Sequence, residues 1–216
     1  MVKRYQCENS GTQSGMETNI IYMEPIILAS ESPRRKELFE LMGLPFTCMS
    51  PDIDESILPG CDPRNVVKEF AIKKVEKIVD TLPDNPLWVC GADTLVSLDG
   101  IIYGKADNRS EAKETLSALQ GKTHEVLTAI ALYSGKTGKT DCRIITGNVT
   151  FASLNSGEID WYVDTEEWKG AAGAYRIQGK ASCFITEIQG QYSTIMGLPL
   201  REFYVMLRDN NYPYGG

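Results

Sequence analysis

The stretch IILASESPRRKELFELM, from Ile26 to Met42, decides the fold. Its first residues, Ile26 to Leu28, form a short apolar run that is typical of a buried strand. Ser32 can cap a helix, and Pro33 suits the first helical position, where its missing N–H group has no intrahelical partner. Gly43 marks the helix end. The stretch therefore predicts a strand, a tight loop and a helix.

The start of this helix is a candidate anion site. A helix start offers free N–H groups and the positive end of the helix dipole. Arg34, Arg35 and Lys36 stand in its first turn, where cations are unfavourable unless an anion joins them. A phosphate would satisfy the N–H groups and the guanidinium groups together. The alternative is an exposed basic turn with Glu31 and Glu37 as partners, and these residues alone leave both interpretations open.

Length and composition fit one large domain, or two lobes, with a sizeable core. The chain has 216 residues, 42% hydrophobic, and a net charge of -7, which argues against a protein that coats nucleic acid. No apolar run approaches the roughly 20 residues needed to span a bilayer. The six cysteines form no C-x-x-C pair, which disfavours a zinc site. Several of them lie inside apolar strand-like runs, which predicts buried free thiols, and the set indicates a reducing cytoplasm.

The chain divides into three segments. Residues 1–23 predict a disordered extension, because the stretch from Asn9 to Asn19 is rich in Ser, Gly, Thr and Gln and has little to bury. This extension also lacks the hydrophobic segment of a signal peptide. Residues 24–210 predict a single folded domain, and residues 211–216 a C-terminal tail.

The folded domain predicts strands and helices in mixed order. Caps, turn residues and apolar patterns indicate the elements. They are a strand at Phe46 to Met49, a helix capped by Asp62, a strand from Leu87 to Leu98 with an Asp99-Gly100 hairpin turn, a helix capped by Ser110, strands at His124 to Tyr133 and Arg143 to Leu154, a helix from Asn155 to about Val163 with a capping box, a strand from Phe184 to Ile188, a polar turn from Ser193 to Gly197, and a last helix started by Pro199.

Several charged residues stand where charge is costly. Asp93 lies in the middle of an apolar strand, and a buried carboxylate is expensive unless it is paired or binds a metal. Lys74 lies on an otherwise apolar helix face, where the residues alone favour a lysine that extends along the surface to solvent over a functional one. An acidic loop from Asp52 to Glu55 and a lysine at Lys105 complete this set.

The available chemistry is limited by what the sequence lacks. His124 is the only histidine and has no nucleophile motif nearby, which disfavours Ser-His-Asp or Cys-His catalysis. Neither G-x-x-x-x-G-K-[ST] nor G-x-G-x-x-G occurs. Mg²⁺ is typically held by one or two carboxylates plus substrate phosphates, and arginine and lysine supply the charge that a polyphosphate needs. The set suggests metal-assisted hydrolysis of a phosphate anhydride.

Five motifs, in one order from Ile26 to Arg208, resemble the Maf family of nucleoside triphosphate pyrophosphatases. They are LASESPRRKELFELMG, DIDES, GADTLVSLDG followed by GK, KGAAGAYRIQG, and GLPL. The resemblance implies an α/β fold with an elongated mixed sheet, flanking helices and two lobes around a cleft, as in the inosine triphosphate pyrophosphatases. It also implies cleavage of a nucleoside triphosphate to monophosphate and pyrophosphate with a divalent metal (Mg, Mn or Co), and a homodimer.

The resemblance also implies residue roles. Asp93 matches the proton acceptor, and with Glu55 and Asp54 it would hold the metal. The residues facing the triphosphate would be Ser30, Arg34, Lys74 and Lys105, joined by Arg35 from the basic helix start, and those that mark base selection would be Arg34, Thr94 and Gln178. Ala106 replaces a proline found in many members, which should alter the turn and not the charge of Lys105.

The motifs also indicate a subgroup. Thr94 after GAD and Gln178 in IQG look like the dTTP/UTP subgroup, whereas the 7-methyl-GTP subgroup typically has Ser-Asp-Gln and Ser-Glu-Gly there. We therefore expect hydrolysis of dTTP, UTP and modified pyrimidine nucleotides as nucleotide-pool housekeeping. The alternatives are a 7-methyl-GTP pyrophosphatase and a regulator of septum formation that binds nucleotide without turnover. An RNA-binding module is disfavoured by the acidic balance.

Overall fold

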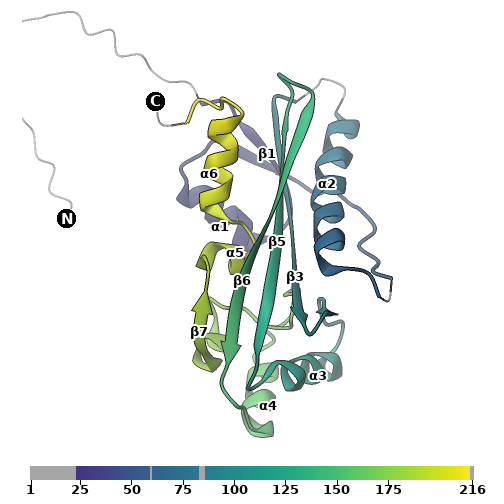
Figure 1. Ribbon diagram of the computed structural model, residues 1–216, viewed down its shortest axis with the longest axis vertical. Coiled ribbons are helices and arrows are strands. Elements are labelled where there is room, and N and C mark those ends of the chain that lie inside the picture. Colours follow the sequence, from purple (N-terminus) through teal and green to yellow (C-terminus); the bar gives the residue numbers. More distant parts are fainter. Residues whose placement is uncertain (1–22, 59, 83–85, 215–216) are drawn as a thin grey trace, which may run out of the picture.

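The computed structural model describes residues 23–58, 60–82 and 86–214. They form an elongated molecule built on one seven-stranded mixed sheet with helices on both faces, which confirms the predicted fold class (Figure 1). Of the predicted N-terminal extension, all but Met23 falls outside the described residues.

The sheet has the strand order β2-β1-β3-β5-β6-β7, and β4 pairs with β3. Strand β1 is parallel to both β2 and β3, whereas the pairs β3–β5, β5–β6 and β6–β7 are antiparallel. The elements are β1 (Ile26–Ala29), α1 (Pro33–Leu41), β2 (Phe46–Met49), α2 (Pro63–Thr81), β3 (Trp88–Leu98), β4 (Ile101–Tyr103), α3 (Arg109–Leu119), β5 (Thr123–Ser134), β6 (Lys139–Phe151), α4 (Ser156–Asp164), η1 (Lys180–Phe184), β7 (Ile185–Gln189), α5 (Tyr192–Met196) and α6 (Leu200–Asp209).

Local sequence patterns located most helix starts. Asp62 caps α2 by accepting a bond from the backbone of Arg64, and Asn155 and Glu158 form the predicted capping box of α4. The prediction of Ser110 as the cap of α3 is wrong. The cap is Asn108, two residues earlier, whose side chain accepts from the backbone N–H of Glu111.

Two further predictions are corrected. The polar segment before the last helix is a short helix, α5, and the chain turns only at Gly197, which has a φ of 108°. Of the five cysteines in the described part of the chain, all are free but only Cys90 is buried. Position within an apolar run therefore overestimated thiol burial.

Both faces of β1 and β3 are covered in the upper half of the molecule. Alternate residues of a strand point to opposite faces. Trp88, Cys90 and Ala92 pack with side chains of α1 and α6, whereas Val89 packs with side chains of α2. The same alternation turns Asp93 towards α2.

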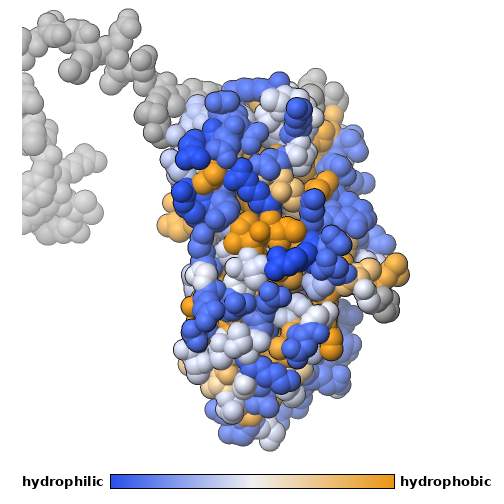
Figure 2. Space-filling view, viewed as in Figure 1, coloured by the Kyte–Doolittle hydropathy of each residue, from blue (hydrophilic) through white to orange (hydrophobic). Residues whose placement is uncertain are grey.

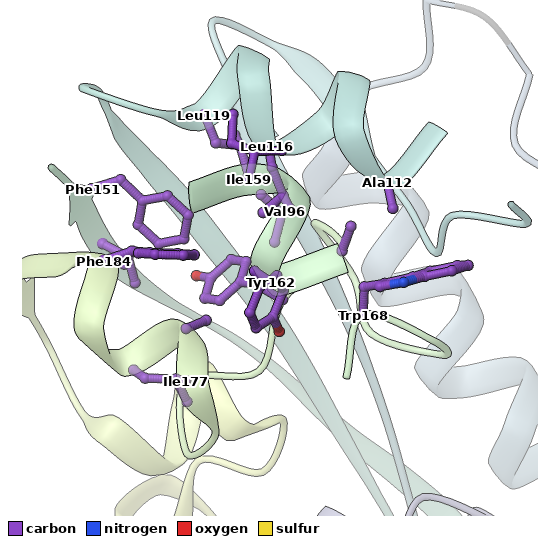
Figure 3. Packing of buried hydrophobic residues seen from close by; sticks show 14 of the residues in the cluster. Val96, Ala112, Leu116, Leu119, Phe151, Ile159, Tyr162, Trp168, Ile177 and Phe184 are labelled. Atoms are coloured by element: carbon purple, nitrogen blue, oxygen red, sulfur yellow. The ribbon is translucent and has the colours of Figure 1, made fainter. Parts of the chain in front are cut away.

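A separate hydrophobic cluster builds the lower half (Figure 3). Leu116 from α3, Tyr162 from α4 and Phe151 from β6 join Trp168 and Ile177, which come from the irregular segment after α4. This packing anchors the segment from residue 168 to residue 178 on the sheet. The polar residues that this segment carries are thereby held in fixed places.

The surface of the described residues is mainly polar. Figure 2 shows hydrophilic residues over most of one face, with apolar residues gathered near its middle. In residues 23–58, 60–82 and 86–214, no helix combines the length and the apolar character needed to cross a membrane.

The contact between α2 and β3 predicts a sharp effect at Gly91. A Cβ atom there would lie 2.8 Å from Val75 Cγ2 and 2.9 Å from the carbonyl oxygen of Ala71. Gly91→Ala should therefore push α2 off the sheet and lower the free energy of unfolding by about 1–3 kcal/mol, measured by urea denaturation. Gly104→Ala, which meets no atom within 4 Å, is the matched control. Equal stability of the two variants would contradict this packing.

Candidate active site

The main cleft lies where β3 has a free edge. On that side β1 pairs with β3 only as far as Gly91, and β4 begins to pair at Val96. Residues 92–95 of β3 face the gap, and the loops after β1 and β2 flank it because the carboxyl ends of these parallel strands meet there. The cleft has a volume of about 540 Å³ and is bounded below by residues 169–172 and 175–178.

The cleft brings together nearly all the predicted site residues. Those that line it are Ser30, Arg34, Arg35, Glu55, Lys74, Asp93, Thr94, Lys105 and Gln178. Asp54 does not line it: its carboxylate accepts bonds from Ser56 N (2.9 Å) and Ser56 Oγ (2.5 Å). Asp52 lines the cleft in its place, with a φ of 29° that is uncommon for a residue other than glycine.

An ammonium group joins two carboxylates at the centre of the cleft. Lys74 Nζ lies 2.6 Å from Asp93 Oδ1 and 2.7 Å from Glu55 Oε1. Lys74 is 5% exposed and Asp93 is 6% exposed. Lys74 therefore does not extend to solvent, and that interpretation of the helix pattern is wrong. The buried carboxylate of Asp93 has a cationic partner, as its cost requires.

Glu55 extends this network to a second lysine. Lys105 Nζ lies 2.7 Å from Glu55 Oε2, so the two carboxylate oxygens hold different ammonium groups. Partial burial would raise the pKa of Glu55, but hydrogen bonds from Lys105 and Lys74 outweigh it and lower this pKa to about 2. The carboxylate of Glu55 is therefore ionised at neutral pH.

Positive charge converges at the start of α1 without carboxylate partners. The side chain of Ser32 makes no capping bond to the first turn. Arg34 Nη2 and Arg176 Nη2 donate to adjacent carbonyls, Gly170 O (3.4 Å) and Lys169 O (2.8 Å). Among the described residues, neither arginine forms an ion pair with a carboxylate. Burial, followed by the charges of Arg176 and Arg35, lowers the pKa of Arg34. This part of the cleft is suited to an anion.

Arg35 holds three segments together. Its guanidinium donates to Gly197 O (2.9 Å), Ser30 Oγ (3.2 Å) and Thr94 Oγ1 (3.3 Å). These acceptors come from the end of α5, the loop after β1, and β3. Burial lowers the pKa of Arg35, and the charges of Asp93 and Glu55 oppose this effect. Its predicted contact with substrate stays a prediction.

Sequence reasoning gave no role to several residues that shape the cleft. Arg176 lies in the quoted motif KGAAGAYRIQG, where its charge could have marked it. Thr128 stands directly opposite Thr94 in the β3–β5 ladder, so only the strand register reveals it. His124, by contrast, does not line the cleft; it is buried and contacts Tyr175 Oη at 2.9 Å. Burial lowers the pKa of His124 to about 4.

The fold and the cleft define an α/β protein whose cleft combines carboxylates with lysine and arginine side chains. A family model described as Maf-like protein matches residues 25–210, and the chain therefore belongs to the Maf family.

Curated relatives are similar in sequence to this chain over most of their length. The chain is 42% identical over 189 residues to a dTTP/UTP pyrophosphatase of Bacillus anthracis, covering 88% of this chain and 97% of the relative. It is 40% identical over 200 residues to a protein of the same name from Treponema denticola, covering 88% and 98%. Among solved structures, the Ham1 protein of Staphylococcus aureus aligns with a TM-score of 0.47 and 16% identity, over 86% of this chain and 96% of that one.

Removing the central ammonium should destabilise the protein. Lys74→Met leaves Asp93 buried without a cation, which should lower the free energy of unfolding by about 3 kcal/mol in urea denaturation. The double variant Lys74→Met/Asp93→Asn should recover most of this loss, because it leaves no unpaired buried charge at position 93. A single variant as stable as the parent protein would show that Lys74 does not form this ion pair.

Proposed function

We propose that this protein hydrolyses dTTP, UTP and modified pyrimidine nucleoside triphosphates to the monophosphate and pyrophosphate, as a housekeeping enzyme of the nucleotide pool. The observation that carries the proposal is the Glu55–Lys74–Asp93 network, in a cleft beside Arg34 and Arg176, which form no ion pair with any carboxylate of the described residues. The family and the printed names of the curated relatives support it.

Asp93 acts as the proton acceptor in this proposal. A water oxygen attacks the α-phosphorus, the bond from that phosphorus to the α–β bridging oxygen breaks, and its electron pair leaves with pyrophosphate. Asp93 takes the proton of the water through its carboxylate. Lys74 and Lys105 stabilise the negative charge that develops on the phosphate oxygens. Arg34 and Arg176 bind phosphate oxygens at the helix start.

Glu55 and Asp93 are the residues that would hold a divalent metal. Their carboxylates converge on one position, which the Lys74 ammonium occupies, and carboxylate oxygens are ligands that Mg²⁺ prefers. In the described part of the chain, no group of three or more acidic, histidine or cysteine side chains could hold a metal. A metal held by Glu55 and Asp93 would therefore need substrate phosphates to complete its ligands. A bound metal would supply charge stabilisation and lower the pKa of a bound water.

Polar residues on the side of β3 opposite Asp93 select the base. Thr94 lines the cleft with Gln178, which comes from the anchored lower segment. Both side chains can form hydrogen bonds with the edge of uracil or thymine. We also infer a cytoplasmic enzyme, which the free cysteines of the described residues support. The homodimer stays a prediction from the resemblance.

Pyrophosphate release from a panel of nucleotides tests the function. With Mg²⁺ or Mn²⁺ present, dTTP and UTP should be cleaved faster than ATP, GTP and 7-methyl-GTP, because a site built to bond one base leaves polar groups unpaired with another. Preference for 7-methyl-GTP would move the protein to the other subgroup. Tight nucleotide binding without pyrophosphate release would favour the regulator.

The variant Asp93→Asn tests the proposed role of Asp93 as proton acceptor. It keeps the shape of the side chain, and Lys74 keeps Glu55 as a partner, so the fold should persist. Turnover should fall by roughly 10²-fold or more. Near-normal turnover in this variant would remove Asp93 from its proposed role.

Metal binding should be clearest once the ammonium is gone. In Lys74→Met the two carboxylates lack their cation, so saturating Mn²⁺ should raise the melting temperature by about 5 °C, more than in the parent protein. Lys74→Met/Asp93→Asn, with one carboxylate removed, should lose this response. The same shift in both variants would place the metal elsewhere.

A further inference from the structure

A hydrogen bond joins the hydroxyl group of Thr94, which lines the cleft, to that of the buried Thr128. Because Thr94 and Thr128 are directly paired across β3 and β5, their side chains share one face of the sheet. Their Oγ1 atoms lie 3.0 Å apart. Thr128 Oγ1 lies 2.8 Å from the carbonyl oxygen of Thr194 in α5. Thr128 is 0% exposed, so its hydroxyl bonds only within the protein.

The direction of each hydrogen bond follows from counting protons. A hydroxyl has one proton to donate, and a carbonyl oxygen only accepts. Thr128 therefore donates to Thr194 O and must accept from Thr94. Arg35 Nη2, which only donates, supplies a bond to Thr94 Oγ1 at 3.3 Å. Thr94 has thus used its proton and one lone pair, and it can offer a ligand only the other lone pair.

The end of α5 keeps this arrangement fixed. Gly197 has a φ of 108°, and a Cβ atom there would lie 3.1 Å from Thr94 Oγ1. The Gly197 carbonyl accepts from Arg35 Nε at 2.9 Å, so α5 holds the guanidinium that bonds Thr94. The hydroxyl of Thr94 therefore lies against Arg35, Thr128 and Gly197.

We propose that Thr128 is a positioning residue for base selection: by accepting the proton of Thr94, it makes Thr94 an acceptor that binds the N3–H group of uracil or thymine. This inference rests on the proposed function and deepens it. Cytosine has an unprotonated N3, which is an acceptor at the same place on the ring. An acceptor facing an acceptor leaves both unpaired, and the site therefore discriminates against cytosine.

Thr128→Val tests this directly. Valine has a similar shape but cannot take the proton of Thr94, so Thr94 becomes free to donate to N3 of cytosine. The Thr194 carbonyl keeps a bond from Gly197 N (3.0 Å), so the variant should fold. Calorimetric titration with UMP and CMP should show the preference for UMP reduced by about tenfold, the effect expected for one hydrogen bond. UTP and CTP kinetics should show the same change in KM rather than in kcat.

Two controls separate positioning from general packing. Thr128→Ser keeps the hydroxyl and should restore the UMP preference. Thr123→Val removes another threonine hydroxyl pair from β5, Thr123–Thr150 at 2.8 Å, away from the cleft, and should leave the preference unchanged. An unchanged preference in folded Thr128→Val would overturn the proposal.

N3-methyl-UMP gives a second test on the parent protein. It lacks the N3–H donor and should bind about tenfold more weakly than UMP. Equal binding, or no binding of either UMP or CMP, would also overturn the proposal. Because these are binding measurements, their failure is distinct from a failure to release pyrophosphate, which would instead reject the proposed function.

Discussion

The structure of the cleft depends on one ammonium group, that of Lys74, between the carboxylates of Asp93 and Glu55. Each carboxylate would be costly in a partly enclosed site without it. Lys74 comes from α2, Asp93 from β3 and Glu55 from the loop after β2, so the ion pairs also fix three segments relative to one another. A polyphosphate would meet charges that are already in place, which is the advantage of a preorganised site.

Strand β3 lets two kinds of chemistry share one cleft. Asp93 faces α2 and the lysines, whereas the next residue, Thr94, faces Arg35 and the end of α5. Successive residues of a strand point to opposite faces, yet both reach the cleft because β3 has a free edge between β1 and β4. The roles proposed in hydrolysis and base selection thus fall on adjacent residues that form different hydrogen bonds.

Sequence patterns predicted the strands, the helices and the cleft residues well where the physics is local. Pro33, Asp62 and the Asn155 capping box act within one turn, and the Asp99-Gly100 turn acts between neighbouring strands. Local patterns also erred, since Asn108 and not Ser110 caps α3. Other predictions failed because contacts outside the local pattern decided them. The helix pattern around Lys74 could not show that Asp93 lies within reach. The composition of the acidic loop could not show that Asp52 lines the cleft while Asp54 bonds Ser56. Only the register of β3 with β5 shows that Thr128 lies opposite Thr94.

The position of the Lys74 ammonium can be observed by NMR of its ¹⁵Nζ group. We expect a slowly exchanging ammonium signal that couples through hydrogen bonds to the carboxyl carbons of both Glu55 and Asp93, and that is absent in Lys74→Met. An ammonium group that exchanges rapidly with water and couples to neither carboxyl carbon would contradict this position.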